Sequence, residues 1–360
     1  MVVRRLAAAS PRHPVQVIGP TFGGKPFPGI DFLAVSVPRW LPLKPTQSYA
    51  VVLRRALARL APGPIEVHNK PDVALSLARA FPDRPVSLFL HNDPRTMRGA
   101  RSPRARQRLL GELAAIVTVS DWLSHALLDG LSARHGRRPL VIHNALDLAS
   151  LPAPRPPDAR EKLILFAGRV VREKAPDAFI AACAEALPKL PGWRAEIMGA
   201  SGFQADEPDS AFIRGLRGAA EVAGVRLVGK RPHDEVLARM ARAAIVVVPS
   251  RWEEPFGLAA LEAMGCGAAL MSSGRGGLAE IGGDACLPFD PDDPAASGRA
   301  LQRLASSPEQ RAALSARGLR RARERFDLRD AIARLDALRD AIAQSRDPAC
   351  GPPVARGASG

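Results

Sequence analysis

Short apolar, β-branched runs alternate with amphipathic segments of helical periodicity along both halves of the chain. In the first half this pattern predicts strands at Val15–Gly19, Phe32–Ser36, Ile65–His68, Val86–Leu90, Ile116–Ser120 and Leu140–His143, and helices at Ser48–Ala61, Asp72–Phe81 and Asp121–Leu131. In the second half it predicts strands at Leu163–Ala167, Arg194–Met198, Val225–Val228, Ile245–Pro249 and Ala268–Ser272, and helices at Pro176–Leu187, Ser210–Ala223, Asp234–Ala243 and Gly257–Met264. Strands that alternate with helices predict parallel, doubly wound sheets of the α/β class.

A proline-rich segment, Leu151–Arg160, interrupts the alternation near the middle of the chain. We interpret it as a linker between an N-terminal domain of residues 1–150 and a C-terminal domain of residues 161–327. The 360 residues are enough for two domains. Because ligands of doubly wound sheets bind beyond the carboxyl ends of the strands, we expect two Rossmann-like domains that face each other across a cleft.

Three more helices are predicted toward the C-terminus, at Pro294–Ala305, Pro308–Arg325 and Leu328–Gln344. We expect the last, within residues 328–345, to pack back toward the N-terminal domain, and the Pro- and Gly-rich residues 346–360 to be disordered. The second of these helices carries a dense positive face, which is either a solvated surface or a contact with an anionic membrane. That face consists of Arg317, Arg320, Arg321, Arg323 and Arg325.

The net charge of +15 is the unusual bulk property and favours an anionic partner. The candidates are nucleic acid, an acidic membrane surface and a phosphorylated substrate. Nucleic acid is disfavoured because the chain shows no helix-turn-helix, zinc-finger or RNP-like pattern, and aromatic residues make up only 5% of it.

The sequence also indicates the cellular compartment of the protein. No apolar run approaches the roughly 18 residues of a membrane span. The basic N-terminal segment MVVRRLAAASPRHP lacks the apolar core of a secretory leader. The four cysteines lie far apart, with no spacing typical of a metal site or a disulfide framework. We therefore expect a cytoplasmic protein, with peripheral contact at the inner face of the plasma membrane as an option.

Two segments of the second half carry the candidate chemistry, FAGRVVREK (166–174) and PSRWEEPFGLAALEAM (249–264). A helix that starts near Gly257 aims free N–H groups and its positive dipole end at a ligand. Glu254 before the helix and Glu262 within it could hold sugar or ribose hydroxyls. Arg169 and Lys174 could neutralise phosphates between them. This pattern predicts a phosphate-ester site, whereas GxGxxG, Walker A and GxSxG motifs are absent.

The string Glu254-x7-Glu262 within EPFGLAALEAM, together with AGRVVREK and GGLAEIGGD, resembles the retaining glycosyltransferase family 4 of GT-B fold. The resemblance extends over about Val15 to Leu338. In the first half it includes VTVSDWLSHAL, VIHNALDL and LFLHND. The combination of IEVHNKPD with LFLHNDP is most similar to bacterial cell-envelope enzymes that extend lipopolysaccharide core or related surface glycans.

The resemblance implies a role for each matched residue. Arg169 and Lys174 would bind the donor diphosphate and support charge on the leaving group. Glu262 would hold the ribose hydroxyls, Glu254 would face the donor sugar, and His91 would lie beside the reacting sugar. His68 and His143 end neighbouring strands in the same way, so a structural histidine is the alternative interpretation of His91. Backbone N–H groups of Phe256, Gly257 and Leu258 would lie near the phosphates, and the segment of Gly229, Lys230 and Arg231 would border the base.

The implied reaction is transfer of a sugar from a nucleotide diphosphate to an acceptor hydroxyl with retained anomeric configuration. No Asp-x-Asp is placed to hold a metal at the diphosphate, so we expect a metal-independent enzyme without a cofactor. A UDP-sugar is preferred over a GDP- or ADP-sugar as the donor. The second hypothesis is an inactive GT-B homologue that binds a nucleotide-sugar or a partner without transfer. A GT-B phosphorylase or a nucleotide-sugar epimerase is a third.

The acceptor is expected to be a glycan or lipid-linked molecule, including a phosphorylated one. Six arginines lie between positions 95 and 108 on a predicted loop directly after His91. Arg95, Arg98 and Arg101 are the candidate acceptor contacts, and a solvated loop is the alternative.

The N-terminus departs from the family pattern, which opens with a strand, a Gly-rich loop and a helix. VQVIGP resembles the second strand of that pattern, so the first strand and its loop are expected to be missing from the N-terminal domain. Gly23–Gly24 is the alternative candidate for the loop.

Overall fold

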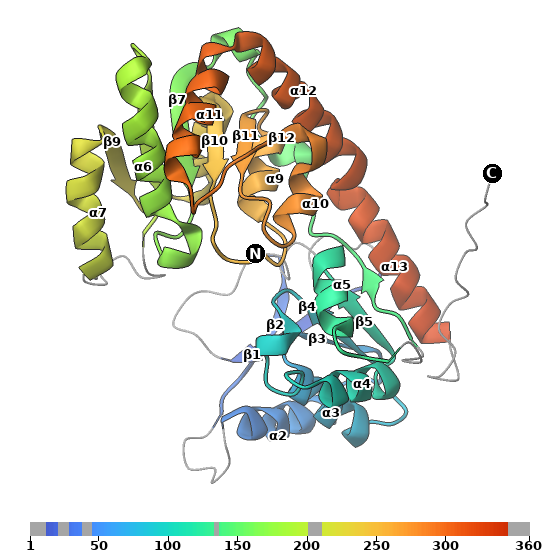
Figure 1. Cartoon of the computed structure of the whole chain (residues 1–360). Helices are drawn as coiled ribbons and strands as arrows, with labels where there is room; N and C mark the ends of the chain where they lie inside the picture. The colour runs from blue at the N-terminus through green and yellow to red at the C-terminus, as the bar shows by residue number, and fades with distance from the viewer. Residues whose placement is uncertain (1–11, 21–28, 38–44, 133–136, 201–210, 345–360) are drawn as a thin grey trace. The chain divides into compact units, whose positions relative to one another are not determined.

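The computed structural model describes residues 12–20, 29–37, 45–132, 137–200 and 211–344, arranged in two compact units (Figure 1). Unit 1 comprises residues up to Asn144 together with those from Arg329 onward, and unit 2 comprises Ala145–Leu328. Gly23–Gly24 and the segment before Arg12 lie outside the described residues. No helix in the described part of the chain is long and apolar enough to cross a membrane.

Unit 2 contains a six-stranded parallel sheet in the order β12-β11-β10-β7-β8-β9. Taken from β7 onward, this is the 3-2-1-4-5-6 order of the Rossmann fold, which reverses between β7 and β10. Ligands of this fold bind beyond the carboxyl ends of the strands at such a reversal. The strands are β7 (Glu161–Ala167), β8 (Arg194–Met198), β9 (Val225–Gly229), β10 (Ala243–Val248), β11 (Ala269–Ser272) and β12 (Cys286–Pro288).

Helices cover both faces of this sheet, as its apolar strands require. On one face Phe166 of β7 packs with Phe179 of α6 and Leu301 of α11 in one buried cluster. α9 contacts α8, α12 and β10 (Figure 1). The helices are α6 (Pro176–Ala186), α7 (Ala211–Val222), α8 (His233–Arg242), α9 (Leu258–Gly265), α10 (Leu278–Gly282), α11 (Pro294–Ser306) and α12 (Pro308–Arg325).

Unit 1 holds a four-stranded parallel sheet, β3-β4-β5-β6, and a separate parallel pair, β1-β2. A cavity of about 700 Å³ is lined by β1, β3 and the helices α2 and α3. Leu53, Val73 and Leu109 come from the three helices α2, α3 and α4 and share one apolar core with β3 and β4. The strands are β1 (Gln16–Pro20), β2 (Asp31–Val35), β3 (Ile65–His68), β4 (Val86–Leu90), β5 (Ala115–Thr118) and β6 (Leu140–Val141). The helices are α2 (Pro45–Leu57), α3 (Pro71–Ala80), α4 (Pro103–Glu112), α5 (Asp121–Leu128) and α13 (Leu328–Gln344).

The prediction of an α/β fold with two Rossmann-like, parallel-sheet units is confirmed. The prediction of a loop over the six arginines is confirmed for Arg98 and Arg101 and wrong for Arg104, Arg106 and Arg108, which lie in α4. A 3-10 turn at Pro94–Thr96 is followed by α4, which Ser102 caps by accepting from Ala105 N at 3.2 Å. α4 forms because Leu109 and Leu110 are buried in the core of unit 1.

The proline-rich segment Leu151–Arg160 lies within unit 2 and not between the units. Arg160 is buried and anchors it, donating to the carbonyls of Ala243 (3.0 Å) and Cys266 (2.8 Å). α13 from Arg329 onward groups with unit 1, where Arg339 pairs with Glu66 through two bonds of 2.7 and 2.9 Å.

The positive face predicted on α12 is smaller than the sequence pattern indicates. Arg321 is half-buried and donates to the carbonyls of Ile281 (2.8 Å) and Glu280 (2.6 Å). This guanidinium therefore holds α10 against α12 and is not available to a membrane.

Candidate functional site

Lys174 and Glu254 come together at the reversal of the unit 2 sheet. Lys174 ends a 3-10 turn after β7, and Glu254 follows β10. The Lys174 ammonium forms an ion pair with Glu254 Oε1, and Ser250 Oγ donates to the same oxygen. Glu254 is buried, so these two partners compensate the removal of its charge from water.

Backbone hydrogen bonds hold the loop that carries Arg169 and Lys174. Gly168 N donates to Met198 O and Val170 N donates to Ala200 O, both at 3.0 Å. Arg251 N and Trp252 N donate to Glu173 O at 2.9 and 3.1 Å, which ties the loop after β7 to the loop after β10. Arg169 is exposed beside these bonds, so its guanidinium can reach a ligand from a fixed backbone.

The N-terminus of α9 borders the same place. Its cap residue Gly257 has φ +110°, a conformation that favours glycine. Leu258 is the first helical residue, and its N–H group and that of Ala259 precede the first bonds of the helix, in which Ala260 N and Leu261 N donate to Gly257 O at 3.0 and 3.2 Å. Phe256 is buried against Phe326 with ring centroids 5.8 Å apart, so only its backbone is suited to contact a phosphate.

The segment GGLAEIGGD packs directly on Glu254. Gly277 N donates to Glu254 O at 2.6 Å, and a Cβ at Gly276 would lie 2.4 Å from the same carbonyl oxygen. The two glycines therefore allow a close approach that helps to place the Glu254 side chain.

Glu262 lies inside α9, and its carboxylate is close to a histidine that the sequence analysis did not select. His233, the first residue of α8, places Nε2 2.9 Å from Glu262 Oε1. Ser250 was also missed. The signal for His233 was its place at a helix start just after the predicted base-binding segment, but the pairing with Glu262 spans 29 residues and no local pattern contains it.

The segment of Gly229, Lys230 and Arg231 leads from β9 into α8. Gly229 has φ +79°, and its carbonyl accepts from Gly199 N at 2.9 Å. Lys230 and Arg231 are exposed, and Arg231 lies 3.9 Å from Glu235. This segment therefore reaches the same carboxyl edge of the sheet as the Arg169 loop.

In unit 1, His91 follows β4 and contacts His68 of the neighbouring strand. His68 Nδ1 and His91 Nε2 share a hydrogen bond of 2.9 Å, and the rings stack with centroids 5.2 Å apart. Asn69, at φ +55°, accepts from His91 N at 2.8 Å. Burial lowers the pKa of His68 to about 4, with help from Arg339, and the pKa of His91 to about 3, with help from His68. Both rings are therefore neutral near pH 7.

The histidine pair predicts an acid-sensitive unit 1. Both pKa values lie below the ordinary value of 6.5, so the unfolded chain binds protons first as the pH falls. The free energy of unfolding should fall from about pH 6.5 downward, by roughly 2 kcal/mol per histidine near pH 5. Urea unfolding at several pH values measures this slope, and His68→Phe should flatten it. If the free energy of unfolding depended on pH in His68→Phe as it does in the unmodified chain, the two histidines would not titrate as described.

The candidate acceptor arginines are held in place by neighbours of unit 1. Arg95 pairs with Asp93 at 2.9 Å, and its guanidinium carbon lies 5.5 Å from the centroid of the Trp122 ring. Arg98 lies 3.4 Å from Asp72, and Arg101 donates weakly to Thr96 O at 3.4 Å. All three are exposed and could contact an anionic ligand.

Arg106, in the same run, is different because it is buried. It donates to the carbonyls of Leu127 (2.8 Å), Ala100 (3.1 Å) and Arg101 (3.0 Å), and to that of Asp129. These bonds join α4 to the end of α5 and are structural.

Arg106→Ala should therefore destabilise unit 1 by about 2–4 kcal/mol, because it leaves buried carbonyls without donors. Arg101→Ala is the matched control and should change the free energy of unfolding by less than about 0.5 kcal/mol. Denaturant titration of both variants tests the difference. If Arg106→Ala and Arg101→Ala had equal free energies of unfolding, Arg106 would not have the structural role described here.

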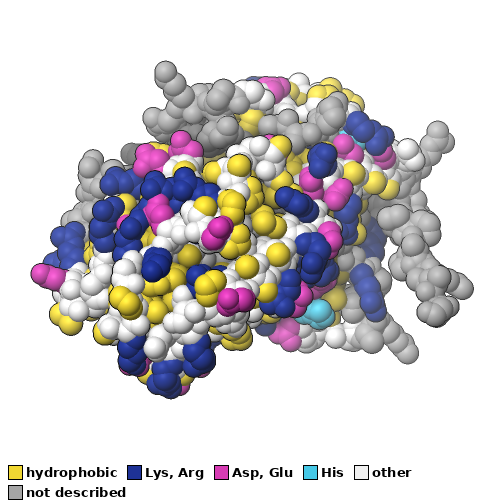
Figure 2. All heavy atoms as spheres, turned by 90° about the horizontal axis from the view of Figure 1, so that it is seen from above, with side chains coloured by type: hydrophobic (Ala, Val, Ile, Leu, Met, Phe, Trp, Pro, Cys, Tyr) yellow, Lys and Arg dark blue, Asp and Glu magenta, His cyan; other side chains and the backbone are white. Residues whose placement is uncertain are grey.

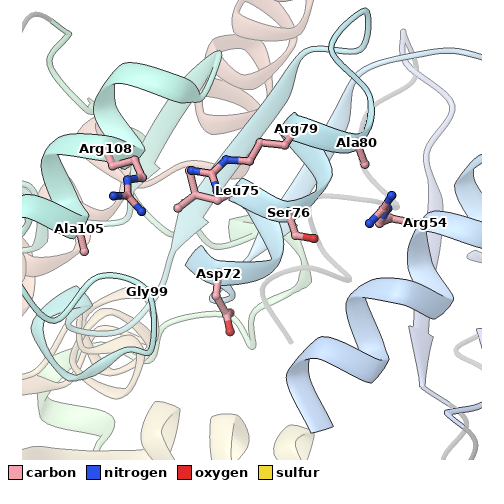
Figure 3. A pocket seen from close by; sticks show the side chains of 9 residues that line it. All are labelled: Arg54, Asp72, Leu75, Ser76, Arg79, Ala80, Gly99, Ala105 and Arg108. Atoms are coloured by element: carbon pink, nitrogen blue, oxygen red, sulfur yellow. The ribbon is translucent and has the colours of Figure 1, made fainter. Parts of the chain in front are cut away.

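A surface pocket of about 440 Å³ lies among α2, α3 and α4 (Figure 3). Arg54, Arg79 and Arg108 line it, and Figure 3 shows Arg79 and Arg108 extending toward each other. Glu112 pairs with Arg79 at 2.8 Å and lies 3.8 Å from Arg108, so part of this charge is compensated. Figure 2 likewise shows Lys and Arg in several groups with acidic side chains among them.

The family model described as "Glycosyl transferases group 1" matches residues 150–321. A D-inositol 3-phosphate glycosyltransferase of Frankia alni is 31% identical over 277 residues, which cover 69% of this chain and 67% of that protein. One from Nocardioides sp. is 34% identical over 230 residues, covering 58% of this chain and 49% of that protein. The chain thus spans about half the length of the first relatives it matches.

Solved structures show the same fold at low identity. Sucrose-phosphate synthase from Thermosynechococcus elongatus has a TM-score of 0.74 at 19% identity, covering 95% of this chain and 93% of that one. Anabaena HepE in complex with UDP-glucose has a TM-score of 0.68 at 17% identity, covering 86% and 85%. The predicted GT-B fold is therefore confirmed. With the sequence match to the family and to the Frankia protein, the chain belongs to the group 1 glycosyltransferases.

Proposed function

We propose that the chain transfers a sugar from a nucleotide diphosphate to an acceptor hydroxyl, with retention of the anomeric configuration. The observation that supports it is the contact between Lys174 and Glu254 at the reversal of a Rossmann sheet, beside the N-terminus of α9. A cation, a carboxylate and free backbone N–H groups at one sheet edge suit a diphosphate linked to a sugar.

In this proposal the protein works mainly on the leaving group. Arg169 and Lys174 neutralise the charge that develops on the departing diphosphate, and the N–H groups at Gly257 and Leu258 bind its oxygens. Glu262 accepts from the ribose hydroxyls, and Glu254 faces the donor sugar. Because side chains and N–H groups supply the positive charge, the transfer needs neither a metal nor another cofactor.

The acceptor attacks from the face that the diphosphate leaves, and a phosphate oxygen takes the acceptor's proton. His91 is proposed to lie beside the reacting sugar. With its pKa lowered to about 3 by burial and by His68, it contributes a neutral ring and not a charged acid.

The proposed donor is a UDP-sugar, in preference to GDP- or ADP-sugars. The proposed acceptor is a cell-envelope glycan or glycolipid at the cytoplasmic face of the plasma membrane. Exposed Arg95, Arg98 and Arg101, with the arginine-lined pocket of Figure 3, favour an acceptor that carries phosphate. The D-inositol 3-phosphate named for the relatives is of that chemical type.

A panel of UDP-, GDP- and ADP-sugars in a thermal-shift assay tests the donor, because a ligand that binds only the native state raises the unfolding temperature. Donor consumption with a mixed glycolipid extract then separates transfer from binding. A shift without turnover in any extract would favour the inactive binding homologue, and no shift with any nucleotide would contradict the proposal.

A further inference from the structure

The contact between His233 and Glu262 joins two segments that sequence reasoning treated separately. His233 opens α8 directly after the segment proposed to border the base, and Glu262 lies in the middle of α9. Their side chains meet with Nε2 2.9 Å from Oε1. The histidine side chain is 37% exposed and the carboxylate side chain 9%, so the contact lies between buried α9 and the partly exposed start of α8.

Glu262 is held in an otherwise apolar stretch. Its neighbours Leu261, Ala263 and Met264 are fully buried. A buried carboxylate is tolerated only when donors satisfy it, and a carboxylate has about four acceptor positions on its two oxygens. His233 supplies a donor to Oε1. Because a carboxylate only accepts, the hydrogen of this bond belongs to His233 Nε2.

We propose that His233 is a positioning residue for nucleotide recognition, which orients the Glu262 carboxylate so that it can accept from the ribose hydroxyls. The inference rests on the proposed function, because it takes Glu262 as the ribose contact. Without the bond to Nε2, the carboxylate loses one of the contacts that fix its orientation, and its bonds to two adjacent hydroxyls become less well aligned.

The positioning role of His233 can be distinguished from a purely structural role by comparing the binding of two nucleotides. Loss of the positioning bond should weaken binding of a ribose nucleotide more than binding of one without the 2′-hydroxyl, because the latter makes one bond fewer to Glu262. The dissociation constant of 2′-deoxy-UDP divided by that of UDP therefore measures how well the Glu262 carboxylate is positioned.

The experiment measures that ratio by calorimetry for the full chain and four variants. His233→Phe keeps a ring but removes the donor, and we expect the ratio to fall roughly 3- to 10-fold, with 2′-deoxy-UDP affinity within about 2-fold of wild type. His233→Gln places an amide donor at a similar reach and should restore much of the ratio. Glu262→Gln should lower the ratio as His233→Phe does. Asp234→Ala, exposed on the next residue of α8, is the matched control and should leave it unchanged.

A wild-type ratio in His233→Phe would overturn the positioning role while leaving the proposed function intact. A wild-type ratio in Glu262→Gln would overturn it as well, because Glu262 would not be the ribose contact. If the unmodified chain bound no nucleoside diphosphate at all, the proposed function itself would fail, and this inference with it. Unfolding temperatures of the variants show whether a changed ratio comes from a disturbed fold.

Discussion

Replacing Lys174 or Arg169 by alanine should lower turnover by roughly two or more orders of magnitude, the scale of losing one preorganised charge contact to a transition state. Lys174→Ala should have the larger effect, because it also leaves the buried Glu254 carboxylate without its ion-pair partner. Arg169 is exposed, so its loss should spare the fold. Initial rates of donor consumption and calorimetric UDP affinity measure both effects.

Lys189→Ala is the matched control for this prediction. Lys189 pairs with Glu185 on the surface at 2.7 Å, and its removal should change neither the rate nor the UDP affinity. If Lys174→Ala and Arg169→Ala both kept near-normal rates, the site at the sheet reversal would be the wrong one.

Gly199→Ala should prevent stable folding of unit 2, or lower its free energy of unfolding by more than about 3 kcal/mol. Gly199 has φ +153°, and a Cβ there would lie 1.7 Å from Gly168 O. That carbonyl directly precedes Arg169, so any relief of the clash moves the loop that carries Arg169 and Lys174. Soluble yield, unfolding temperature and UDP affinity should all fall.

Gly224→Ala is the control that introduces the strain of a positive φ without a steric clash. Gly224 also has a positive φ, +68°, but a Cβ there meets nothing within 4 Å. It should lower the free energy of unfolding by only about 1 kcal/mol, from the left-handed backbone alone. Equal losses in the two variants would show that the close approach to Gly168 does not determine the packing.

Much of the fold could be predicted because its signals are local. The runs at Ile65–His68, Val86–Leu90 and Arg194–Met198 form strands with the predicted bounds, as does the helix Pro308–Arg325. Buried parallel strands are short and apolar, and a cap residue such as Ser307 followed by Pro308 marks a helix start. The residues of EPFGLAALEAM were selected for the same reason, since the turn and the helix lie in one string.

The arginine run shows where local signals fail. Its helix, α4, has few apolar residues, and only Leu109 and Leu110 in the core of unit 1 show why it forms. Arg106 has the same sequence context as exposed Arg104, yet it is buried because four carbonyls from two segments, residues 100–101 and 127–129, converge on it. The proline-rich segment was misjudged in the same way, because the carbonyls that hold Arg160 come from residues 243 and 266.

The sequence by itself determined the α/β class and the main strands and helices, because each depends on neighbours within a few turns of chain. The residues suited to a diphosphate stay a prediction. Only the tertiary structure decided the sheet order of unit 2, which brings the loops after β7 and β10 together. It also decided the partners of the two carboxylates, Lys174 and Ser250 for Glu254 and His233 for Glu262. Apart from Ser250, these partners lie 80 and 29 residues away. Contacts over such separations follow from how whole elements pack, and no local pattern of residues encodes them.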